Sequence, residues 1–404
     1  MKKEKTIVRE GRANEAYGLM IGLMIGLMGL MGCSRDETSA GGSNGQRVAS
    51  TEVEVASFVT GYDEANGANR AEAYRAYGAG AHRAWAIPDG YVAYEDGIQP
   101  IGIAFTQNDV APKIGSFFKS SDKWRTDLEN IADGTYQLYG YIPHQTAINY
   151  SITGYDGANG SYSTGAIMTL ENVPTVMPND LCVVIGAKHG YDREHDGNSD
   201  GTNRLRKGDF SFTAKQGTDS KDYVFLLFDH LYAALRIRMK VHADYDVLRT
   251  IKLKSLELNT QAGDTKTTKK TTITIKLKAN DGSSSPIETL TFTPTGEEID
   301  GGLEFWSSTY GEQLTTDFKP FIGHFMPSGI TKLILTSTYD VYDRKGNLIR
   351  QNCKATNTMV LKDLLTDQSE TERGKRYTIN MTIQPTYLYM LSEPDLDNPT
   401  VVVN

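Results

Sequence analysis

The sequence has few cysteines and no excess of positive charge. Its 404 residues include only three cysteines, Cys33, Cys182 and Cys353, and 42 Lys and Arg stand against 50 Asp and Glu. Because the cysteines are few and widely spaced, neither a disulfide framework nor a cysteine-based metal site is expected. A net charge of -8 disfavours a nucleic-acid partner, since binding to phosphate needs a concentrated positive field.

Motifs that carry enzyme chemistry are also missing. The sequence contains no G-x-S-x-G elbow, no P-loop, no H-E-x-x-H pair and no G-x-G-x-x-G opening a helix. Its carboxylates and histidines are not paired at catalytic spacing. We therefore predict that the chain is not an enzyme.

The longest apolar run is too short to cross a membrane as a helix, which takes about 20 residues. It covers residues 19–32, follows a segment rich in Lys and Arg, and has the length of a secretory signal core. It ends in Leu-Met-Gly-Cys33, which resembles a bacterial lipobox, where a small residue precedes the cysteine that carries the lipid. We predict a signal peptide over 1–32, lipidation of Cys33 and a flexible tether over 33–47. A non-lipidated signal or an anchor helix is the alternative.

Beyond residue 50 the dominant pattern is alternation of apolar and polar residues. It is clearest over 235–241, 273–277 and 377–383, where each segment is typical of a strand with one buried face. The phase changes near Ser255, which predicts a β-bulge, and residues 343–347 predict a hairpin turn. Shorter strands are predicted at 91–94, 101–105, 136–142, 167–170 and 181–185, and one helix at 122–132.

Strands therefore outnumber helices, and the 39 glycines suit a chain rich in turns. We predict an all-β fold with two antiparallel β-sandwich domains in tandem. The polar run that starts at Gln216 is the expected boundary, so the domains are predicted over 48–215 and 216–404.

One acidic segment is a candidate metal site. Its carboxylates approximate the spacing of a calcium loop, and they are Asp192, Glu194, Asp196 and Asp200. The twelfth position is Asn203 rather than the usual bidentate glutamate, so a solvated acidic loop is the alternative. No other cofactor is predicted.

Four stretches resemble one protein family. They are the lipobox at Cys33, the segment WAIPDGYVAYEDGIQPIGIAFTQND from Trp85, the segment FLLFDHLYAALRIRMKV over 225–241, and the C-terminal KRYTINMTIQPTYLYMLSEPDLDNPTVVVN. Together they resemble the fimbrillins, the type V pilins of the Bacteroidetes. The resemblance implies two transthyretin-like sandwiches and a lipoprotein precursor exposed on the outer membrane. It also implies a trypsin-like protease that removes an N-terminal strand, leaving a groove that accepts a strand from another subunit.

Both ends of the chain fit this scheme. A first strand is predicted within 48–60, and the Ala- and Gly-rich segment 61–84 after it offers cleavage sites. The candidate sites are Arg70, Arg75 and Arg83, with Arg47 ahead of the strand. At the other end, Pro385 interrupts the last alternating strand. The candidate donor strand beyond it carries Tyr387, Leu388, Tyr389, Met390, Val401, Val402 and Val403, and the alternative is that it closes its own domain.

The sequence thus predicts a structural pilus subunit or a fimbria-associated adhesin. Its expected partners are other pilus subunits, the outer membrane through the lipid, and a ligand on a host or bacterial surface. The alternative is a surface lipoprotein that binds glycan or host protein and never polymerises.

Overall fold

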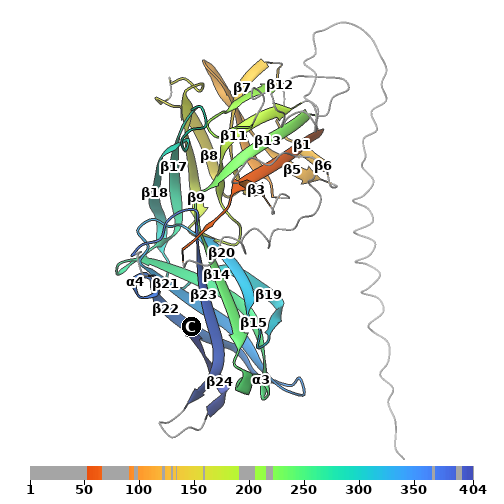
Figure 1. Cartoon of the computed structure of the whole chain (residues 1–404), viewed down its shortest axis with the longest axis vertical. Helices are drawn as coiled ribbons and strands as arrows, with labels where there is room; N and C mark the ends of the chain where they lie inside the picture. The colour runs from red at the N-terminus through yellow and green to blue at the C-terminus, as the bar shows by residue number, and fades with distance from the viewer. Residues whose placement is uncertain are drawn as a thin grey trace, which may run out of the picture. The chain divides into compact units, whose positions relative to one another are not determined.

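A computed structural model describes residues 52–65, 91–94, 99–120, 123–128, 131–132, 134–157, 160–190, 205–214, 222–365, 369–387 and 394–403. All of them lie in one compact unit, Arg47–Asn404. Within these residues the regular structure is nearly all strand, as predicted (Figure 1). None of the helices in the described part combines the length and the apolar character needed to cross a bilayer.

The first pair of sheets contains most of the N-terminal strands. A nine-stranded sheet has the order β11 (Cys182–Gly190), β13 (Asp222–His230), β1 (Glu52–Thr60), β6 (Lys123–Thr126), β5 (Val110–Ser120), β4 (Ile101–Gln107), β7 (Gly134–Ile142) and β12 (Ser211–Ala214), with β3 (Tyr91–Ala93) beside β1. Because β11 also pairs with β7, the strand order closes on itself. A four-stranded sheet follows the order β18 (Ile287–Glu298), β17 (Thr268–Lys278), β9 (Gly165–Pro174) and β8 (Asn149–Gly154).

The second pair of sheets contains the remaining strands. A six-stranded sheet has the order β10 (Val176–Met177), β20 (Lys319–Phe325), β14 (Ala233–Val241), β23 (Lys375–Tyr387) and β2 (Asp63–Glu64), with β24 (Pro394–Val403) beside β23. A five-stranded sheet has the order β16 (Thr265–Lys266), β15 (Arg249–Ala262), β21 (Lys332–Asp343) and β22 (Leu348–Val360), with β19 (Leu303–Leu314) beside β15. The short helices α3 (Ala243–Asp246) and α4 (Leu361–Leu364) follow β14 and β22.

Alternation places the apolar side chains in three buried clusters. In β14 the residues Leu235, Ile237, Met239 and Val241 are buried and the basic residues between them are partly exposed, so the predicted pattern is confirmed. Their cluster lies between the six- and five-stranded sheets. A second cluster joins the nine- and four-stranded sheets, and a third draws on the other side chains of the nine-stranded sheet. Each pair of sheets thus has its own core.

The predicted division at residues 215 and 216 does not coincide with a division between sheets. Strand β13, which follows it, pairs with β1 and β11, and β17 pairs with β9. Strand β10, which precedes it, pairs with β20. The sheets are also not purely antiparallel, because β1 runs parallel to β13 and β14 runs parallel to β23. A local polar run identifies a loop, whereas sheet membership depends on pairing between residues far apart in the sequence.

Three local predictions can be compared with the strands. The bulge near Ser255 is confirmed, since the register of β15 shifts between Leu253 and Ser255 against both neighbours. The hairpin is also confirmed, because Asp343 and Asn347 close the turn between β21 and β22. The helix predicted over 122–132 is wrong. Lys123–Thr126 forms β6, where Trp124 is buried and tertiary packing overrides local helix propensity.

Candidate functional site

Most of the residues predicted to act at a site lie outside the described part of the chain. These are Cys33, Arg47, Arg70, Arg75, Arg83, Asp192, Glu194, Asp196, Asp200, Leu388, Tyr389 and Met390. The lipidation, cleavage and calcium predictions therefore stay predictions. Of the candidate donor strand, Tyr387 ends β23, and Val401, Val402 and Val403 lie in β24.

In this structure the candidate donor segment pairs within its own chain. Val401 faces Ile383 and Val403 faces Met381 in an antiparallel pairing of β24 with β23. Val401 is buried in the core of the second sheet pair. The side-chain amide of Asn357 also donates to the Val401 carbonyl at 2.8 Å. This arrangement corresponds to the alternative in which the segment closes its own domain.

The predicted first strand is β1, and it lies in the interior of the nine-stranded sheet. Val53–Val59 pair in parallel with β13, and the other edge of β1 pairs with β6 and β3. Phe58 and Val59 are both buried but belong to different clusters, one on each face of the sheet. Figure 1 shows β1 alongside β13, although many strands separate them in the sequence.

At the end of β1 a buried histidine holds the backbone. The Nε2 atom of His230 lies 2.6 Å from the Thr60 carbonyl, and its Nδ1 atom lies 2.7 Å from Oδ2 of Asp180. The Tyr62 ring stacks on the imidazole at 3.7 Å between centroids. Since a carbonyl and a carboxylate both accept, both ring nitrogens carry protons and His230 is an imidazolium. Asp180 and His230 are therefore a buried ion pair.

The pKa shifts of this pair follow from its surroundings. Burial alone lowers the pKa of His230, but the Asp180 carboxylate, helped by Asp229 and the Thr60 carbonyl, raises it above its ordinary value. Burial likewise raises the pKa of Asp180, and the His230 charge outweighs that effect and lowers it well below its usual range. Each group thus stabilises the charged form of the other.

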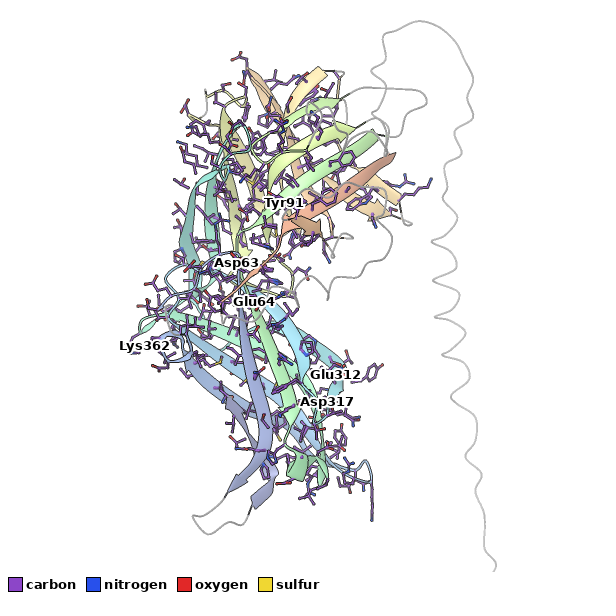
Figure 2. All side chains as sticks on the ribbon, viewed as in Figure 1. Asp63, Glu64, Tyr91, Glu312, Asp317 and Lys362 are labelled. Carbon is purple, nitrogen blue, oxygen red and sulfur yellow. The ribbon has the colours of Figure 1, made fainter. Side chains whose placement is uncertain are left out.

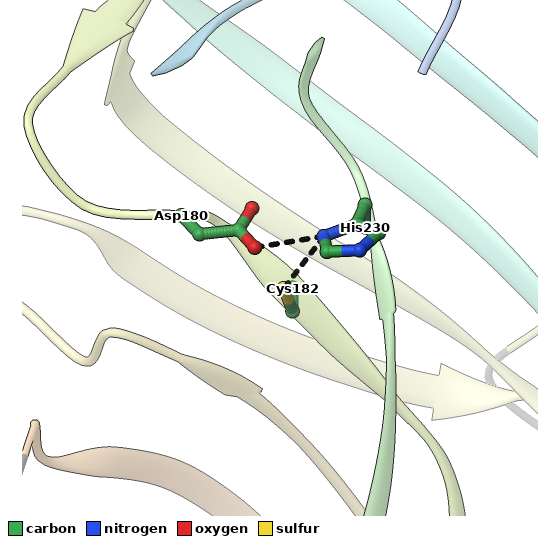
Figure 3. Close-up of side chains that lie close together, drawn as sticks. All are labelled: Asp180, Cys182 and His230. Atoms are coloured by element: carbon green, nitrogen blue, oxygen red, sulfur yellow. Dashed lines mark hydrogen bonds and ion pairs between the residues drawn. The ribbon is translucent and has the colours of Figure 1, made fainter. Parts of the chain in front are cut away.

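The same region contains Cys182, which gives it the residue types of a catalytic triad or a metal site (Figure 3). The ligand atoms of Asp180, Cys182 and His230 lie within 4.8 Å of one another. In a nucleophilic triad the histidine would accept from the thiol through one nitrogen and bind the carboxylate through the other. Here Cys182 and Asp180 both approach Nδ1, while Nε2 is bound to Thr60. A metal would need a deprotonated Nδ1, so this geometry suits an ion pair better than either alternative.

Glu64 lies four residues after Thr60 and is labelled in Figure 2. Its carboxylate is buried between two arginines, Arg376 and Arg236. Nε of Arg376 donates to its carboxylate at 2.6 Å, and Nη2 of Arg236 lies 3.6 Å from the second oxygen. The side chains of Glu64 and Arg376 are only 4% and 5% exposed. Around them the backbone of β2 pairs with β23, through Asp63 N–H to Gly374 and Ala65 N–H to Arg376.

We call residues 60–65 the strap. They connect β1 in the nine-stranded sheet to β2 in the six-stranded sheet. At one end the Thr60 carbonyl binds the buried His230 imidazolium, and at the other Glu64 forms a buried ion pair with Arg376. Burying such charges is tolerated only when each is paired and hydrogen-bonded. The Glu64 end of the strap therefore depends on a charge that a purely apolar segment could not supply.

Comparisons with known proteins add a set of solved structures. No family model matches the chain, and no curated protein does. A candidate cell adhesion protein from Bacteroides ovatus aligns over 89% of this chain and 96% of its own, at 10% identity and a TM-score of 0.34. One from Bacteroides fragilis aligns over 87% and 96%, at 10% identity and a TM-score of 0.33.

A fimbrial protein from Bacteroides ovatus aligns over 82% of this chain and 48% of its own, at 9% identity and a TM-score of 0.29. These neighbours belong to the adhesion and fimbrial class that the sequence resemblance names, and none of the three is an enzyme by description. At such low TM-scores they carry no argument about the function of this chain.

Sequence reasoning missed the strap, the ion pairs of Glu64 and the Asp180–His230 pair. Alternation over 235–241 predicts that Arg236 faces solvent, yet its side chain is only 18% exposed and lies against Glu64. The sequence gives little warning, because Glu64 and Arg376 are 312 residues apart. The only local hint is a glutamate directly after a predicted strand, which is common on surfaces.

Proposed function

We propose that this chain is a surface fimbrial subunit or fimbria-associated adhesin that assembles by replacement of its N-terminal strand. Before assembly the lipid on Cys33 holds it on the outer membrane. A trypsin-like protease then cuts at Arg70, Arg75 or Arg83, which frees β1 and the strap. A strand from a neighbouring subunit takes their place.

The observation that carries this proposal is the position of β1. It is paired on both edges and contributes Phe58 and Val59 to two cores. Its removal leaves β13 with unpaired backbone groups and opens apolar slots on both faces of the sheet. Exposed strand edges of this kind bind another strand, because backbone hydrogen bonds and side-chain pockets are both available.

Limited proteolysis of the purified full chain tests the proposal. Trypsin should cut after the strap, and the processed protein should form a ladder of multimers that resist SDS. A variant with Arg70→Gln, Arg75→Gln and Arg83→Gln is the matched control; it should keep β1 joined to the rest of the chain and remain monomeric. A cleaved wild-type chain that releases β1 and stays monomeric contradicts assembly. It would favour the alternative, a surface lipoprotein that binds glycan or host protein without polymerising.

A further inference from the structure

The two arginines around Glu64 form a receptor for a carboxylate. Arg376 and Arg236 come from β23 and β14, which lie side by side in parallel register. Thr378, on β23, also donates to Glu64 at 3.4 Å and accepts from Nε of Arg236 at 3.0 Å. The ion pairs found for Arg376 in the described chain all lead to Glu64.

Any strand that replaces β1 and the strap must cover Arg376 and Arg236. An apolar or neutral segment would leave a guanidinium that is 5% exposed without its carboxylate. Removing one partner of a buried charge pair is strongly unfavourable, because the other charge stays desolvated. The receptor therefore discriminates between strands by charge, in addition to the shape of the apolar slots.

The end of β1 and the strap define a pattern of residue types at fixed spacing. Reading FVTGYDE over 58–64, Phe58 and Val59 enter the two cores, Tyr62 lies against His230, and Glu64 meets the arginines. Gly61 and Asp63 are exposed, so other residue types fit there. Thr60 contributes its carbonyl to His230, a group that any residue supplies.

The same pattern occurs once more near the C-terminus. Residues 387–393 read YLYMLSE, which places Tyr387 and Leu388 in register with the two core residues. Leu391 falls in register with Tyr62, and Glu393 with Glu64. An aromatic residue, a branched aliphatic residue, a large apolar residue and a glutamate thus recur at identical spacing.

We propose that Arg376 and Arg236 select the incoming strand by its carboxylate, and that residues 387–393 of a second copy of this chain are such a strand. Glu393 of that copy then takes the place of Glu64. This inference rests on the proposed replacement of β1, and it adds both the register and the charge requirement.

Peptide exchange into the nicked protein tests the inference. A full chain with a site-specific protease sequence in place of residues 71–76 is cut, so that the N-terminal fragment stays bound without a covalent link. Labelled peptides are then added in excess, and binding is followed by fluorescence anisotropy and by release of the fragment in mass spectrometry. The peptides cover residues 52–65 and 386–395, each as wild type and with Glu64→Gln or Glu393→Gln.

Both wild-type peptides should exchange, and each glutamine substitution should weaken binding at least about tenfold. The peptide with Asp395→Asn, which changes an acid outside the seven residues, should bind like wild type. With Arg376→Gln protein the difference between Glu393 and its glutamine variant should disappear. Arg376→Lys, which keeps the charge, is the second variant if the first does not fold, and should retain a preference for glutamate.

The outcomes separate the two proposals. If the 52–65 peptide exchanges and the 386–395 peptide does not, this inference is overturned and strand replacement stands. If the glutamine peptides bind as well as wild type, the charge requirement is wrong. If the 52–65 peptide itself cannot re-enter, strand replacement fails and this inference with it.

Discussion

The two terminal strands, β1 and β24, are attached in different ways. β1 has strand partners on both edges and is followed by a strap whose Glu64 is buried in ion pairs with Arg376 and Arg236. In the described part of the chain, β24 pairs with β23 alone and is tied further by one amide from β22. The N-terminal strand is therefore integrated into the interior of its sheet, whereas the C-terminal strand is attached to its sheet through a single neighbouring strand among the described residues.

The largest expected effect tests the Glu64 end of the strap that follows β1. Glu64→Gln leaves Arg376 and Arg236 without their carboxylate, so the free energy of unfolding of the full chain should fall by about 3 to 5 kcal/mol. Urea denaturation measures it. Glu312→Gln is the control, because that glutamate is 37% exposed in its pair with Lys319 and should change stability by less than about 1 kcal/mol. Equal losses of stability in the two variants would mean that the ion pairs of Glu64 hold the strap no more strongly than an exposed pair would.

Apolar truncations compare the two strands directly. Phe58→Ala empties a core site in β1 and should cost about 3 to 5 kcal/mol. Val401→Ala in β24 removes less volume and should cost roughly 2 kcal/mol. Both are read from the midpoint of chemical denaturation at unchanged slope. A larger loss for Val401→Ala would reverse the order of attachment proposed here.

The buried ion pair of His230 with Asp180 predicts that stability depends on pH. The folded pKa of His230 is raised above 6.5, so its contribution is complete below that pH and is lost as the pH rises through the folded value. The pKa of Asp180 is lowered below 3.8, so its contribution holds above that pH and is lost only in strong acid. Asp229, His324 and Tyr62 also face this pair.

Thermal unfolding should therefore show stability that declines from mildly acidic to alkaline pH, by on the order of 2 kcal/mol, the worth of a hydrogen bond to a charged group. His230→Gln should remove this decline while leaving the other pH effects in place. If wild type and variant decline in parallel from pH 6 to 9, the imidazolium does not hold β1.

The smallest expected effect concerns the amide that ties β24. Asn357→Ala removes the 2.8 Å hydrogen bond to Val401 and should lower stability by about 1 kcal/mol. Hydrogen exchange of the amides in β24 should speed up more than that of β1, since β24 opens locally. Exchange that speeds up equally in both strands would show that they unfold as one cooperative unit.

Local patterns in the sequence were enough to locate strands but not to pair them. Alternation identified β14 and β17, and the phase change at Ser255 identified the bulge, because both signals lie within a few neighbouring residues. The pairing of β1 with β13 and of β17 with β9 carries no such signal. Strand pairing is decided by which apolar faces pack together across the fold. Because the polar run at 216 reports only a local loop, the expected boundary there does not separate the sheets.

Even less of the candidate site could be predicted from the sequence. Its decisive contacts, Glu64 with Arg376 and Asp180 with His230, join residues whose local sequence suggests an exposed acid or an alternating base. Only the general position of the first strand was predicted, from Val53, Val55 and Phe58. A buried ion pair has no spacing rule, because its partners are brought together by the sheet order and not by the chain.

The pairing of β1 with β13 also constrains the order in which the protein folds. Thr60 and Asp229, which meet through a hydrogen bond at the end of this pairing, are 169 residues apart. Closing so long a loop is entropically costly, and non-local parallel pairing is intrinsically slow to form. On a nascent chain, β1 therefore has no parallel partner until β13 has been synthesised. Because β13 ends at His230, the nine-stranded sheet is completed only after synthesis has passed the midpoint of the chain.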